Sequence, residues 1–196
     1  MKNQAMGLGL VAGLALALAA CSGANGEAAV SVEDVEDKRG ETFAQVLAQD
    51  PSLSIAANAL KQTGLMGALD GKASTTIFVP TNAAFEALDE QTGKLLAQPQ
   101  NSAIAAAVLR NHMVPGVLDI EAINKAITQA GGEASVANFG GGVLTLTNKA
   151  GGLAVQDASG RKAAIPGRVI SVGNGALIAI DAVLVDPALL PASPKP

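Results

Sequence analysis

One stretch, residues 75–85, constrains this chain most, because it places a strand pattern and a stop signal directly before a helix start. Residues 75–79 are β-branched or aromatic, as the pleated surface of a strand prefers. Pro80 has no N–H for a strand ladder, so it predicts the end of the strand. We expect this strand to be buried, with Phe78 in the core, and to pair with other strands, because its backbone groups need partners.

A helix is predicted directly after this strand. Either Thr81 or Asn82 can cap it, since both side chains accept hydrogen bonds from backbone N–H groups. Phe85 and Leu88 would then fall on one face of the helix. We expect Phe85 to be buried together with the strand.

The remaining body divides into two parts. Before Gly131, apolar residues recur at helical spacing; after residue 135 they alternate as in strands, and Asn174-Gly175 is a hairpin turn signal. This predicts an α+β fold with helices first and strands last. The expected helices are residues 41–48, 51–63, 65–69, 82–88, 93–97, 102–111 and 120–130. The expected strands are residues 143–147, 153–156, 163–165, 169–172, 177–180 and 183–185.

Three motifs, in order, resemble the signatures of the fasciclin-like (FAS1) domain. The first is the strand–helix stretch, with Thr76, Phe78, Pro80, Thr81, Asn82 and Phe85. The second is Asn111-His112-Met113-Val114-Pro115-Gly116, and the third runs from Asn174-Gly175 through Asp181 to Leu184. The resemblance covers about residues 43–186. It implies a FAS1-like domain over residues 41–187, with N-terminal helices packed on a β-wedge or sandwich of mostly C-terminal strands.

The N-terminus resembles a bacterial lipoprotein signal. Residues 5–18 are uncharged and apolar, and Leu18-Ala19-Ala20-Cys21 contains the single Cys of the chain. We expect residues 1–20 to be removed and Cys21 to carry acyl chains such as palmitate, which together anchor a protein to a membrane. The alternative is an ordinary secretory signal with a stray Cys. Ser22 after the Cys resembles an outer-membrane sorting signal, so in a Gram-negative cell we expect an outer-membrane or periplasm-facing location.

Two segments outside the domain are predicted to lack a core. Residues 21–40 are small, polar and acidic, which indicates a flexible tether; a first helix beginning near Val30 is the alternative for its last third. Residues 188–196 are Pro-rich and predicted to be a tail.

The sequence argues against catalysis, metal binding and nucleic-acid binding. His112 is the only His, and no Gly-x-Ser-x-Gly elbow accompanies it. One His with scattered carboxylates gives no metal-ligand spacing, and the net charge of −4 without a basic run disfavours nucleic acid. Hairpin turns explain the run Gly140-Gly141-Gly142. We therefore predict no enzyme, no metal and no cofactor.

His112 and Asp181 each leave two interpretations. His112 follows a predicted helix and precedes an extended segment, so it can hydrogen-bond to a carbonyl on one side and accept on the other; alternatively Asn111 and His112 form a contact site. Asp181 is either an inward polar group with a partner or an edge position that faces water, and we expect its role to be structural.

The resemblance implies a binding module at the cell envelope, with adhesion or contact with an unknown protein or matrix partner as its function. The alternative is an extracytoplasmic binder of a small apolar ligand. Two departures from the family pattern limit how far the functions of its members can be assigned to this chain. Asn111 stands where the family has Tyr, and Val169-Ile170 stands where adhesive animal members have Asp-Ile. Integrin binding is therefore not expected. A coloured or lipid-bearing purified protein would favour the alternative, whereas binding to cells without a bound ligand would favour adhesion.

Overall fold

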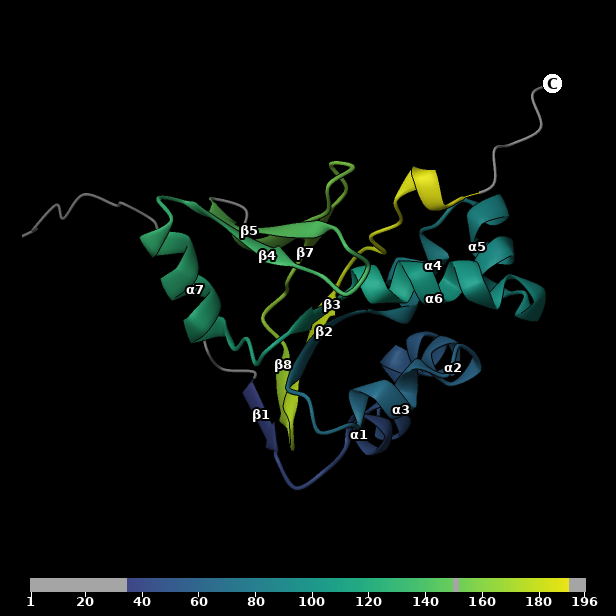
Figure 1. Ribbon diagram of the computed structural model, residues 1–196, viewed down its shortest axis with the longest axis horizontal. Coiled ribbons are helices and arrows are strands. Elements are labelled where there is room, and N and C mark those ends of the chain that lie inside the picture. Colours follow the sequence, from purple (N-terminus) through teal and green to yellow (C-terminus); the bar gives the residue numbers. More distant parts are fainter. Residues whose placement is uncertain (1–34, 150–151, 191–196) are drawn as a thin grey trace, which may run out of the picture.

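The computed structural model of the chain describes residues 35–149 and 152–190, and it confirms the predicted α+β class (Figure 1). Most of its helices precede Gly131 and most of its strands follow that residue. The helices are α1 (Phe43–Gln49), α2 (Ser54–Gln62), α3 (Leu65–Leu69), α4 (Asn82–Glu86), α5 (Glu90–Ala97), α6 (Ser102–Asn111) and α7 (Ile120–Gln129), with 3-10 turns η2 (Pro51–Leu53), η3 (Pro99–Asn101) and η4 (Pro187–Leu189). The strands are β1 (Val35–Lys38), β2 (Thr75–Pro80), β3 (Met113–Pro115), β4 (Glu133–Ala137), β5 (Val143–Lys149), β6 (Gly152–Gln156), β7 (Lys162–Ala164), β8 (Val169–Val172) and β9 (Gly175–Ile180).

The strands form two sheets. The five-stranded sheet has the order β1-β8-β9-β2-β3, and the four-stranded antiparallel sheet has the order β4-β5-β6-β7. In the first sheet β2 runs parallel to β9, with Phe78 opposite Ile178, and antiparallel to β3. This confirms that the strand at residues 75–79 pairs with a C-terminal strand. Pro80 is its last residue, one position beyond the predicted end.

The five-stranded sheet separates two hydrophobic cores, because successive side chains of β2 point to opposite faces. Ile77 and Val79 pack with α1, α2 and α3, whereas Phe78 packs with α7 and the four-stranded sheet. In Figure 1, α1–α6 accordingly gather on one side of the strands and α7 lies on the other. A third, smaller cluster joins α4 and α6 to the C-terminal segment through Ala84, Val108, Val183 and Val185.

The predicted tether is wrong for residues 35–38. They form β1, which pairs in parallel with β8 at the edge of the five-stranded sheet. The alternative of a helix near Val30 finds no support in the described part either, since the chain is a strand from Val35 onward. Arg168 explains why a short acidic segment is ordered here: it bonds to Glu36 on β1 and to Asp50 before η2.

Three further predictions need correction. The strand expected at residues 183–185 is absent; these residues are buried but belong to no ladder. Phe85 is half-buried and not enclosed, because it packs on the rims of two clusters. The predicted tail begins too early, since Leu189 and Leu190 pack on the third cluster; residues 191–196 lie outside the described part. Within the described ranges, no helix is both long and apolar enough to cross a membrane.

Candidate functional site

His112 lies at the C-cap of α6 and has no exposed surface. The backbone N–H of Leu184 donates to its Nε2 at 2.9 Å, so the ring proton resides on Nδ1 and is donated to the Val108 carbonyl at 2.7 Å. The His112 carbonyl accepts from the Phe78 N–H at 2.9 Å. One residue thus connects α6, β2 and the C-terminal segment. The bond to Leu184 also explains why this segment forms no strand: its N–H is already paired with an imidazole.

Burial lowers the pKa of His112 to about 4, against the opposing effects of the Val108 hydrogen bond and the Asp157 carboxylate. The imidazole is therefore neutral at neutral pH, with its one donor and its one acceptor both engaged. A general base needs a free nitrogen within reach of a substrate proton. The geometry thus supports the interpretation of His112 as a junction and gives it no free nitrogen for chemistry.

Asn111 is half-buried and packs on the hairpin between β4 and β5. A Cβ atom added to Gly140 would lie 1.7 Å from its Oδ1, so a larger residue at position 140 would displace the Asn111 side chain. The glycine run is a turn, as predicted: Asn138 Oδ1 accepts from the N–H groups of Gly140 and Gly142 at 3.0 and 2.9 Å.

Phe139, in the same hairpin, is 46% exposed. All four Phe residues lie in the described part, and the other three are buried or half-buried. The chain has no Trp or Tyr, so Phe139 is its one exposed aromatic side chain. The sequence analysis did not single it out. Its position beside a glycine run at a predicted hairpin tip could have indicated an exposed aromatic side chain.

The strand–helix signature is explained by hydrogen bonds. Thr76 Oγ1 donates to the Gly116 carbonyl and accepts from the Leu118 N–H, both at 2.8 Å, which fixes the loop after β3. Thr81 caps α4 by accepting from the Ala84 N–H. Asn82 instead reaches the start of α2, where its Oδ1 accepts from the Ile55 N–H at 3.1 Å.

The C-terminal signature joins distant parts of the fold. Asn174 donates to the carbonyls of Leu69 and Gly71. A Cβ atom on Gly175 would lie 1.8 Å from the Thr75 carbonyl oxygen, so β9 could not approach β2 as closely with any other residue. Asp181 is exposed just after β9, and its Oδ1 accepts from the Ala164 N–H at 2.6 Å, which links the two sheets. All three positions therefore have structural partners.

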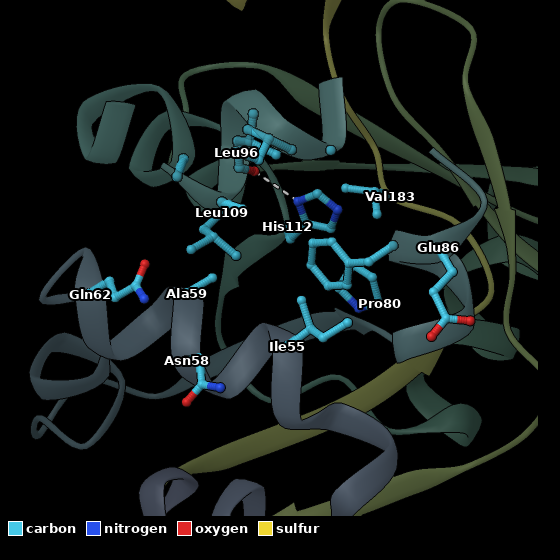
Figure 2. A pocket seen from close by; sticks show the side chains of 15 residues that line it. Ile55, Asn58, Ala59, Gln62, Pro80, Glu86, Leu96, Leu109, His112 and Val183 are labelled. Carbon is cyan, nitrogen blue, oxygen red and sulfur yellow. Dashed lines mark hydrogen bonds between the residues drawn. The ribbon is translucent and has the colours of Figure 1, made fainter. Parts of the chain in front are cut away.

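A cavity of about 330 Å³ lies between α2, α4, α5 and α6. In Figure 2, Ile55, Leu109, Val183 and Pro80 surround the space, with His112 at its inner wall. Besides His112, the polar side chains that border it are Asn58, Gln62 and Glu86. Sequence patterns did not reveal this cavity, because its walls come from four separate helices.

The predicted lipidation site has no described geometry to compare. Cys21 lies outside the described residues. Within residues 35–149 and 152–190, no three His, Cys, Asp or Glu side chains come together in a way that could hold a metal ion.

Comparisons with known proteins agree with this architecture. A model of the Fasciclin domain matches residues 51–186. Protein sll1483 of Synechocystis sp. is 32% identical over 146 residues, which cover 74% of each chain. Among solved structures, a FAS1 domain pair from the insect cell adhesion molecule Fasciclin I matches with a TM-score of 0.66 at 18% identity. That match covers 76% of this chain and 52% of the pair, so the chain spans about half the length of the pair.

Proposed function

The chain belongs to the fasciclin domain family, and from this we propose that it is a lipid-anchored binding module of the bacterial cell envelope that contacts a protein or matrix partner. Fasciclin domains are in general non-enzymatic, adhesion-related modules. The family match over residues 51–186 is the observation that carries this proposal. The engaged nitrogens of His112 support its non-catalytic part.

We place the contact surface at the hairpin between β4 and β5, with Phe139 and its neighbour Asn111. Aromatic side chains are enriched at protein interfaces, and Phe139 is the exposed one. His112, next to Asn111 in the chain, is fully buried and cannot touch a partner itself, so it supports this surface by holding the end of α6.

The contact is tested by binding of whole cells to matrix and by a crosslinked pull-down from intact cells. Phe139→Ser is expected to reduce both at least about fivefold while leaving the melting temperature unchanged, since the side chain is 46% exposed and belongs to none of the three hydrophobic clusters. Val35→Ser is the matched control: Val35 is 42% exposed but lies on β1, at the far edge of the five-stranded sheet from β3. Equal binding by Phe139→Ser and wild type would refute this surface.

The anchor is tested separately by fractionation. The wild-type chain is expected in the membrane fraction with an acylated first peptide, because several acyl chains on one residue hold firmly. Cys21→Ser should move the chain to a soluble fraction without changing its melting temperature. A soluble wild type with an unacylated N-terminus would disprove lipid anchoring but leave the contact surface open to its own test.

A further inference from the structure

We propose that the cavity between α2, α4, α5 and α6 is a binding site for a small, uncharged and largely apolar molecule that carries one hydrogen-bonding group, such as a hydroxyl. This site is separate from the hairpin surface and does not depend on adhesion. Its walls, size and charge each bear on the class of ligand.

The size and lining suit a small organic molecule. A volume of about 330 Å³ is at the lower end of the range of ligand pockets. The surrounding side chains are mainly apolar, with Ile55, Phe85, Leu96 and Leu109 from four different helices. An apolar molecule bound there would remove this apolar surface from water, which is favourable.

The charges around the cavity disfavour anions. Among the described residues that line it, none is Lys or Arg, so a carboxylate or phosphate would find no cation there. The lining instead includes Glu86, which is negatively charged, and the C-terminal end of α2 at Gln62, which carries a partial negative charge. A cation would have to leave water for mostly apolar walls, which is costly. A hydroxyl can both donate and accept, and so can the amides of Asn58 and Gln62.

Gly93 determines how much space the cavity has for a ligand. It lies inside α5, where glycine is less favourable than alanine, and it lines the cavity. Its backbone is not left-handed, and a Cβ atom added to it would meet no atom within 4 Å. Packing therefore does not require glycine at this position. A side chain there would enter the open space at the cavity wall, so glycine leaves this space free for a ligand.

The test uses the full chain and naphthalen-1-ol, an uncharged fluorescent molecule with one hydroxyl. Because the chain has no Trp and no Tyr, the protein adds almost no fluorescence of its own. We expect saturable binding to the wild type. Naphthalene-1-carboxylate, the matched anion, should bind at least about tenfold more weakly, which corresponds to about 1.4 kcal/mol.

Gly93→Leu should lower the affinity for naphthalen-1-ol at least about tenfold, with the melting temperature measured in parallel. Gly67→Leu is the matched control, because Gly67 is a helical glycine in α3 that also has no atom within 4 Å of an added Cβ but does not line the cavity. If Gly93→Leu does not fold, Gly93→Ala replaces it and should show a smaller loss of affinity. The proposal fails if the wild type does not bind saturably, if the carboxylate binds equally well, or if a folded Gly93 variant keeps wild-type affinity.

Discussion

The two hydrogen bonds of His112 make stability depend on pH. Its pKa is about 4 in the folded protein because of burial, but near 6.5 when the chain is unfolded. Below pH 6.5 the unfolded state therefore binds a proton that the folded state does not, so stability falls as the pH falls toward 4. Between about pH 7 and 5 the loss should be about 2 kcal/mol, measured by urea denaturation.

Substitutions at this residue separate titration from hydrogen bonding. His112→Gln can still accept from the Leu184 N–H but cannot titrate, so its stability should stay flat over the same interval. His112→Ala leaves the Leu184 N–H and the Val108 carbonyl unpaired and should cost about 1–3 kcal/mol at pH 7. A wild type that is as stable at pH 5 as at pH 7 would contradict the enclosed, neutral imidazole.

At the scale of elements, Arg168 holds β1 to the body. It donates to Glu36 at 3.1 Å and to Asp50, whose side chain is only 10% exposed. Arg168→Met should cost about 1–2 kcal/mol, because hydrogen bonds to charged groups are lost but the Glu36 side of the network is solvated. Hydrogen exchange should show the β1 amides opening before the rest of the domain.

Arg39→Met is the control for this element. Arg39 pairs with Asp37 on the surface, two residues away, and joins no separate elements. We expect no measurable change in the stability of the domain or in the exchange of β1, since exposed ion pairs contribute little. Exchange of β1 that stays unchanged in Arg168→Met would mean that the strand pairing with β8 suffices on its own.

At the scale of the whole molecule, both cores rest on the same sheet, so the domain should unfold in one transition. Phe43 belongs to the core with α1–α3, and Phe78 belongs to the core with α7 and the four-stranded sheet. Both are fully buried, and changing either to Ala should cost about 3–5 kcal/mol. Calorimetry and circular dichroism should give one coincident transition for each variant. Two separate transitions in either variant would show that the cores fold independently.

Local patterns in the sequence determined the elements themselves. The expected bounds of α3, α6 and β8 agree with the structure, because helical spacing and strand alternation depend on residues only a few positions apart. The same holds for the hairpin turn at Asn174-Gly175 and for the bonding pattern of His112, whose neighbours in sequence already include one partner, Val108.

Tertiary structure alone decided what depends on residues far apart in the chain. From the sequence, Thr81 and Asn82 are equal candidates for the N-cap of α4. In the structure Thr81 caps α4, whereas Asn82 bonds to the start of α2. Residues 183–185 are Val-Leu-Val, as in a buried strand, yet Leu184 gives its N–H to His112, 72 residues earlier. β1 is ordered by Arg168, 132 residues beyond Glu36, and the cavity exists only where four helices meet. A sequence specifies each residue's donors, acceptors and shape, but only the folded chain determines which partners are near enough to pair with them.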